Sequence, residues 1–417
     1  MTAYTPSYKV LINSVEVTDI TLANLIITSG RTDIYSQPVA GYCQLQLLNF
    51  DNSAYNFNVG TQITIEVTDT SATYVPIFGG YISDFTVSVN QTGSLGNTTV
   101  AQITALGALS KLPKLVDDGV LAQDEDGDQI YSLLSGYLLG QWQDVPAATT
   151  WANYTPATGT WADAFNLGLG EIDRPGDFLL IARSANETDV YSLCAQIANS
   201  ALGVLYEEAN GNIGYSDSTH RQDYLAANGY TTLDANHANG YGLAVTTRAG
   251  DIRNKYDITY GNNANQVYVA EDLVSQQTYG VYGEAFLSSI KDTVDAENFA
   301  DRIVALRAYP TPKFQSITFE LGNPEIDNAD RDALINIFMG QPIWIQNLPL
   351  NISNGSFEGY VEGWTFRASL NNLSVTFNAS PVNFSQVAVK WNQVNAAEAW
   401  NTISNTLEWI DAIGVVA

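Results

Sequence analysis

The sequence predicts a β-rich α+β protein with two related antiparallel β-barrel domains and smaller α+β domains. Two observations support this fold class. Apolar residues alternate at period two in many short segments bounded by turn residues, which is typical of half-buried strands. One such pattern also occurs twice, once near each end of the chain, and this repeat predicts a duplicated barrel.

Each copy of the repeat is organised around glycines that precede its strands. Gly60 and Gly80 introduce the first two strands of one copy, and Gly340 and Gly359 introduce those of the other. The apolar strand residues are Ile63, Ile65, Tyr81, Ile82, Val100, Ile103 and Ala105 in the first copy, and Ile343, Ile345, Tyr360, Val361, Leu373, Val375 and Phe377 in the second. We therefore expect two structurally related β units.

The first barrel is expected to occupy residues 1–112. Several strands are predicted between residues 8 and 50, where the segment YCQLQLL alternates clearly. Further strands are predicted over 60–67, 77–89 and 97–106. Alternation that turns one face inward is typical of a barrel or sandwich whose outer side contacts water.

A connector follows over 113–182 and contains an acidic run, DEDGD, at residues 124–128. The run suggests a calcium loop, but the EF-hand spacing is absent and no Glu stands at the twelfth position. A helix over 129–139 that is capped by Asp128 is the favoured interpretation, because acidic residues near a helix start are stabilising.

Tryptophans recur at nearly equal spacing in this connector and again in a C-terminal segment over 386–417. These interaction candidates are Trp142, Trp151, Trp161, Trp391, Trp400 and Trp409. One interpretation is packing, in which short strands hold each indole against a neighbouring element. The other is an aromatic ladder that docks a partner protein or stacks on sugar rings.

An α+β domain is predicted over 183–250, and the second barrel domain over 251–385. The first is expected to contain a helix over 187–202 capped by Ser184 or Asn186, a strand over 204–206, a hairpin at Asn210-Gly211 and a loop-rich span over 224–250. The second is expected to contain strands over 254–260, 266–271 and 314–321, a turn over 275–280, and helices over 295–308 and 330–339.

The balance of charge is strongly acidic, with 17 basic and 44 acidic residues and a net charge of −27. Such a chain repels nucleic acid and anionic membranes, so we expect no stable binding to either. The charge serves solubility, or it lines a surface past which a polyanion slides. We expect no signal peptide and no membrane helix, and we expect Cys43 and Cys194 to be buried free thiols.

Residues with catalytic chemistry form no recognisable motif. His220 and His237 lie outside metal-ligand spacings, and no nucleophile elbow or P-loop is present. Three acids, Glu358, Glu362 and Glu408, lie near tryptophans in the sequence, as in many sugar-cleaving clefts. Exposed acids on β edges are the favoured interpretation, so we predict a protein without enzymatic activity, metal or cofactor; a β-rich glycosidase remains an alternative.

The order of these parts resembles the hub proteins, often called minor tail proteins, at the tip of long-tailed bacteriophages. The resemblance covers residues 185–380. Four segments support it, namely LCAQIANSALGVLYEEANGNIGYSDSTHR, NKYDITYGN followed by DLVSQQTYG, DAENFADRIVALRAYPTPKFQSITFEL, and the strands GQPIWI, GYVEGWTF and LSVTF. The tryptophan-spaced segments are not a fixed feature of that family, and no cell-wall hydrolase segment is evident.

The resemblance implies a homotrimer in the virion, at the tip of the phage tail. Two barrels in each of three chains would form a pseudo-sixfold ring that lines the DNA exit channel. The implied partners are the tail tube and distal tail proteins, the tape measure protein, and tail fibre or tip proteins. A carbohydrate- or receptor-binding tail protein that binds host-surface glycans through its tryptophan ladder is the alternative function.

Overall fold

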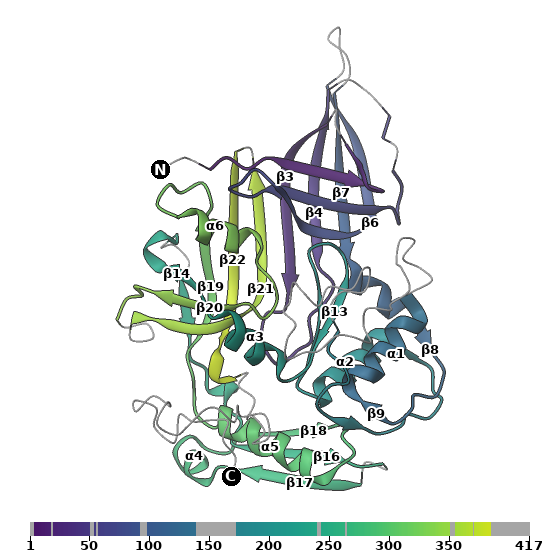
Figure 1. Cartoon of the computed structure of the whole chain (residues 1–417), viewed down its shortest axis with the longest axis vertical. Coiled ribbons are helices and arrows are strands. Elements are labelled where there is room, and N and C mark those ends of the chain that lie inside the picture. Colours follow the sequence, from purple (N-terminus) through teal and green to yellow (C-terminus); the bar gives the residue numbers. More distant parts are fainter. Residues whose placement is uncertain are drawn as a thin grey trace.

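The computed structural model describes residues 4–384 apart from 18–19, 51–53, 56, 92–97, 139–171, 240–242, 263–264, 351–354 and 370. It confirms a β-rich α+β fold, in which strands dominate and helices lie beside and below the main sheet (Figure 1). The α-helices are α1 (Asp126–Leu138), α2 (Val190–Ser200), α3 (His220–Asn228), α4 (Leu273–Tyr279), α5 (Thr293–Arg307) and α6 (Asn328–Ile335).

One 13-stranded sheet contains both copies of the repeat. The N-terminal copy contributes β1 (Tyr8–Ile12), β2 (Val15–Glu16), β3 (Ile20–Gly30), β4 (Tyr42–Asn49), β5 (Gln62–Thr68), β6 (Tyr74–Gln91) and β7 (Thr98–Gly107). The C-terminal copy contributes β14 (Thr231–Asp234), β15 (Ala244–Thr246), β19 (Lys313–Glu320), β20 (Pro342–Gln346), β21 (Phe357–Ser369) and β22 (Asn372–Pro381). The two copies meet where β3 pairs with β21, seen in Figure 1 as purple beside yellow-green.

The described strands do not close into two barrels, which corrects the sequence-based expectation. The sheet runs in the order β15-β19-β22-β21-β3-β4-β7-β6-β5-β1-β2, with β20 and β14 branching from β21. The physical reason is the length of β21. Its first half pairs with β20 and its second half with β3, so the strand extends the sheet into the other copy.

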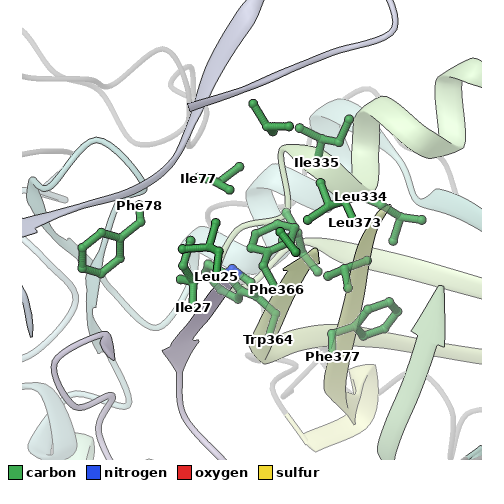
Figure 2. Packing of buried hydrophobic residues seen from close by; sticks show 14 of the residues in the cluster. Leu25, Ile27, Ile77, Phe78, Leu334, Ile335, Trp364, Phe366, Leu373 and Phe377 are labelled. Carbon is green, nitrogen blue, oxygen red and sulfur yellow. The ribbon is translucent and has the colours of Figure 1, made fainter. Parts of the chain in front are cut away.

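A single hydrophobic core follows this sheet across both copies. Leu25 and Ile27 from β3 lie against Trp364 and Phe366 from β21 (Figure 2), and all four side chains are buried. Burial of each large apolar side chain contributes about 1.5–3 kcal/mol, so the two copies are stabilised as one unit.

A second core lies below the sheet, where two smaller units pack together. One unit contains α1, α2 and the hairpin of β12 (Val204–Glu207) and β13 (Ile213–Ser216). The other packs α5 on the sheet formed by β16 (Lys255–Tyr260), β17 (Gln266–Glu271) and β18 (Gly283–Leu287). Short strand pairs complete the first unit: β8 (Val116–Asp117) with β11 (Thr188–Asp189), and β9 (Asp124–Glu125) with β10 (Leu179–Leu180).

Several local predictions are confirmed. Asn210-Gly211 forms the turn between β12 and β13, with Gly211 at φ +90°. Cys43 and Cys194 are buried free thiols. Helix α5 occupies nearly the predicted range, because its apolar residues recur at helical spacing and pack against the sheet below.

Other boundaries differ because the capping residue differs. Asp189, rather than Ser184 or Asn186, caps α2 by accepting a hydrogen bond from the N–H of Ser192. The predicted turn over 275–280 is helix α4, which Asp272 caps in the same way. Each cap satisfies a helix N–H group that has no partner within the helix.

The span over 224–250 was predicted to be loop-rich, and this prediction was wrong in part. Helix α3 reaches Asn228, β14 pairs in parallel with β20, and β15 pairs with β19. These elements are short and polar, so their own sequence has little periodicity, and their neighbours in the sheet determine their structure.

Candidate functional site

The two copies of the repeat have the same hydrogen-bonded plan at their leading glycines. Gly60 and Gly340 both have φ +84°, a conformation that suits glycine. The N–H of Gly60 donates to the carbonyl of Ile82 at 2.7 Å, and that of Gly340 donates to the carbonyl of Val361 at 2.8 Å. The glycines identified in the sequence therefore mark a true structural repeat.

The next strand pair shows the same irregularity in both copies. Pairing of β6 with β7 shifts after Ile82, so Ser83 is the extra residue of a bulge. Pairing of β21 with β22 shifts after Val361, so Glu362 is the extra residue there. The matched bulges align the copies residue by residue, and Thr86 then corresponds to Thr365.

The join between the copies is an antiparallel pairing of β3 with the second half of β21. Gly30 lies opposite Gly363, and the hydroxyl oxygens of Thr28 and Thr365 lie 3.4 Å apart. A Cβ atom on Gly30 would lie 2.4 Å from the carbonyl oxygen of Glu362. Glycine at this position therefore permits the close approach of the two backbones.

An ionic cluster is buried beside this join. The Nε atom of Arg31 lies 2.6 Å from Glu362 Oε2, and Nη1 of Arg221 lies 2.8 Å from Glu362 Oε1. The hydroxyl of Ser380 donates to the same carboxylate at 2.5 Å. The cluster links the residue that follows β3 with α3, β21 and β22, so it connects both copies of the repeat to helix α3.

Glu362 is ionised in this environment. Burial alone would raise its pKa, but the charges of Arg221 and Arg31 and their hydrogen bonds outweigh burial and lower the pKa to about 2. The expectation of an exposed acid on a β edge was wrong for Glu362, which is 1% exposed. A carboxylate held this far below neutral pH cannot act as a general acid.

The N-terminus of α3 carries a second buried network. His220 Nδ1 lies 2.7 Å from Asp173 Oδ2, and Asp217 accepts hydrogen bonds from Thr219 and from the N–H of His220. Burial, and then the nearby Asp173, raise the pKa of Asp217 well above its usual range. This network positions Arg221, the next residue of the helix, toward Glu362.

His237 ends a short 3-10 helix, and its carbonyl accepts a hydrogen bond from Asn323 Nδ2. Among the described residues, neither histidine belongs to a group of side chains with metal-binding geometry. His220 thus lies in a buried hydrogen-bonded network, and His237 lies at the end of a 3-10 helix.

Two further carboxylates, those of Glu207 and Asp126, accept hydrogen bonds from backbone N–H groups. Glu207 accepts hydrogen bonds from the N–H groups of Gly41 and Leu109, and burial raises its pKa to about 7. Asp126 accepts from the N–H groups of Asp177 and Phe178, and burial raises its pKa to about 7 as well. Glu207 therefore connects the lower units to the chain that precedes β4, and Asp126 holds the chain that precedes β10.

The acidic run that suggested a calcium loop lies at the start of α1. The helix begins at Asp126, so Asp128 lies within its first turn and is not the cap that the sequence predicted. Asp124, Glu125 and Asp128 are close enough to hold a metal ion, but Arg174 Nε already lies 2.6 Å from Asp128 Oδ1. This ion pair and the helix start account for the acidic residues.

The six tryptophans proposed as interaction residues, Trp142, Trp151, Trp161, Trp391, Trp400 and Trp409, all lie outside the described residues, as does Glu408. Trp364, in β21, is buried in the core of the join. Glu358 is exposed, as expected, and accepts a hydrogen bond from the hydroxyl of Tyr230.

No helix in the described ranges is long and apolar enough to cross a membrane. No protein-family model and no curated protein sequence matches the chain. Solved structures do share its fold. The 43 kDa tail protein of prophage MuSo2 from Shewanella oneidensis is 10% identical, with a TM-score of 0.56 over 91% of this chain and 99% of its own.

A tail protein from Neisseria meningitidis MC58 is 9% identical, with a TM-score of 0.59 over 92% of this chain and 98% of its own. At these identities the likeness concerns the fold alone. It nevertheless includes nearly the whole length of both proteins, so the arrangement of the two repeats and the lower units is shared as a whole. The chain therefore has the overall fold of these two tail proteins.

Proposed function

We propose that this chain is a structural hub protein of a phage tail, in which three copies form a pseudo-sixfold ring at the tail tip. The observation that carries the proposal is the join of β3 with β21. It sets two copies of one repeat side by side in a continuous sheet, so three chains supply six similar units. The shared fold with two tail proteins supports the same assignment.

The ring would join the tail tube and distal tail proteins to the tip and fibres, and the tape measure protein would meet it from within. Its lumen would form the DNA exit channel. The net charge of −27 supports this arrangement, because an acidic wall repels the DNA backbone and prevents it from sticking.

We also propose that the protein has no enzymatic activity. The acid nearest to a catalytic arrangement in the sequence, Glu362, is bound by two arginines and has a pKa of about 2. Purified protein incubated with peptidoglycan or polysaccharide should release no soluble fragments, measured as reducing ends. Release that Glu362→Gln abolishes would contradict this proposal.

Electron cryo-microscopy of the intact particle tests the assembly directly. We expect density for this chain at the end of the tail as a threefold ring with two similar β units per copy around a channel. A position in a peripheral fibre, or absence from the tail, would refute the hub function.

A further inference from the structure

The second half of β6 has an open edge. From Asp84 to Val89 it pairs with β7 on one side, and no strand in the described chain pairs with it on the other. Val87 and Val89 on this segment are 44% and 60% exposed. An exposed edge of β-branched residues is a template for pairing with another strand.

The matching segment of the other copy is covered. Counting from the matched bulges, Val87 corresponds to Phe366, which lies opposite Ile27 of β3 and is 1% exposed. The same position in the repeat is therefore buried by a neighbouring strand in one copy and exposed in the other. The uncovered β6 edge lacks the equivalent of β3.

The equivalent of β3 in the C-terminal copy is β15. Ile27 pairs with Cys43, which pairs with Ala105 of β7. Val245 of β15 pairs with Phe314, which pairs with Ala379 of β22. Since Ala105 and Ala379 occupy the same place before the two bulges, Val245 corresponds to Ile27, and Thr246 corresponds to Thr28.

We propose that the β6 edge of one copy pairs with the outer edge of β15 from a second copy of this chain, antiparallel and in the register of the internal join. Thr86 then lies opposite Thr246 of the second copy, and Val87 lies opposite its Val245. The proposal rests on the proposed function, because it supplies the contact that would close the ring.

The side chains along the two edges suit this register. Thr86 and Thr246 repeat the facing threonines of the internal join, whose hydroxyl oxygens are 3.4 Å apart. Val87 continues the core face of β6, where Ile82 is 1% exposed, and Val245 also packs on the core. Two positions from the facing threonines, Asp84 would lie opposite Arg248 in this register, and opposite charges on facing strands attract.

The geometry also produces a closed assembly. The contact joins different edges of two copies, so it is heterologous, and such contacts form a ring if the rotation closes. Inside one chain the join relates one repeat to the next. If the contact between chains repeats that relation, every unit in the ring has the same neighbours.

Disulfide trapping tests the register. Thr86→Cys and Thr246→Cys variants are prepared separately, mixed at high concentration and oxidised, and the products are separated on a non-reducing gel. Facing residues on paired strands are within disulfide range, so covalent dimers are expected from the mixture. Native Cys43 and Cys194 are buried and should not compete.

Two controls calibrate the result. The Thr28→Cys/Thr365→Cys variant should form its disulfide within one chain, without dimers, since those hydroxyls already face each other. Thr86→Cys mixed with Val269→Cys, an exposed position on β17, should form no dimers. Dimers in this second control that equal those in the test mixture would overturn the proposed register.

A charge exchange gives an independent measurement. Asp84→Arg places two cations in register and should weaken self-association at least about tenfold. Mixing Asp84→Arg with Arg248→Asp should restore it, measured by sedimentation equilibrium. Weakening that the second variant does not rescue would contradict the pairing of these positions.

The outcomes separate this inference from the proposed function. Trimers in native mass spectrometry without trapping at Thr86 and Thr246 would refute the β6–β15 contact and leave the ring intact. Trapped dimers together with native assemblies larger than trimers would support the contact and refute the trimeric ring. Monomers without any trapped product would refute the contact, while electron cryo-microscopy of the particle still decides the hub function.

Discussion

The buried carboxylate of Glu362 provides the sharpest test of how the two repeats are held together. Glu362→Gln keeps the shape of the side chain and removes its charge, so Arg31 and Arg221 are left buried without an anion. Removal of one partner from a buried ion pair is strongly destabilising, because the remaining charge is no longer compensated.

The size of the effect follows from the pKa of Glu362, which falls from 4.5 to about 2. Each pKa unit corresponds to about 1.4 kcal/mol, so the cluster contributes about 3 kcal/mol at pH 7. This agrees with the range of about 3–5 kcal/mol for breaking a buried pair. We expect Glu362→Gln to lower the free energy of unfolding by about 3 kcal/mol at neutral pH.

The sign of the pH dependence is determined by the direction of the pKa shift. Because folding lowers the pKa, the contribution is fully present above about pH 4.5 and is lost as the pH falls toward 2. The difference between wild type and Glu362→Gln should therefore shrink to about 1 kcal/mol at pH 3.

Urea unfolding followed by tryptophan fluorescence at pH 7 and pH 3 measures both quantities. Glu358→Gln is the matched control, since Glu358 lies on the same strand but is exposed, and it should change stability by less than about 0.5 kcal/mol. A loss below about 1 kcal/mol for Glu362→Gln at pH 7, or an equal loss at pH 3, would show that the ionised Glu362 does not stabilise the join.

Three further predictions concern buried positions. Burial raises the pKa of Glu207 to about 7, so its contribution to the free energy of unfolding falls as the pH rises from about 4.5 through 7. Glu207→Gln should therefore make the melting temperature less dependent on pH between pH 5 and pH 8, and an unchanged pH profile would contradict this. Gly107→Ala would bring a Cβ atom against the Glu207 carboxylate, which the N–H groups of Gly41 and Leu109 hold in place, and should cost about 1–3 kcal/mol in urea unfolding. Gly136→Ala meets nothing within 4 Å and should be neutral or stabilising, so equal effects would refute the close contact. Phe366→Ala should cost about 3–5 kcal/mol, and Val87→Ala at the equivalent place less than about 1 kcal/mol in the monomer; similar losses would contradict their different burial.

Local rules explain the parts of the fold that could be predicted. The glycines at positions 60 and 340 were recognised from sequence because each precedes an alternating strand, and both adopt φ +84°. The Asn210-Gly211 hairpin and the amphipathic α5 follow in the same way from turn chemistry and helical spacing. In each case the residues that determine the local structure lie close together in the sequence.

The ionic cluster at the join could not be predicted by the same rules. Arg31, Arg221 and Glu362 come from distant parts of the chain, and Glu362 faces the two arginines because a bulge turns it out of the regular alternation. In the sequence, nothing distinguishes Glu362 from the other acidic residues that lie near a tryptophan. The sequence signal for the join is the pair Gly30 and Gly363, because the two backbones approach too closely there for a Cβ atom.

Two related β units, most of their strands and a strongly acidic composition could be predicted from the sequence, whereas the short strands β14 and β15 could not. These properties follow from local periodicity, turn residues and composition. The three-dimensional structure was needed to show that the units share one sheet instead of closing as barrels, and which edge of the described strands remains open. Strand pairing depends on which backbone edges meet in space, and the side-chain pattern of a strand specifies its faces but not its neighbours.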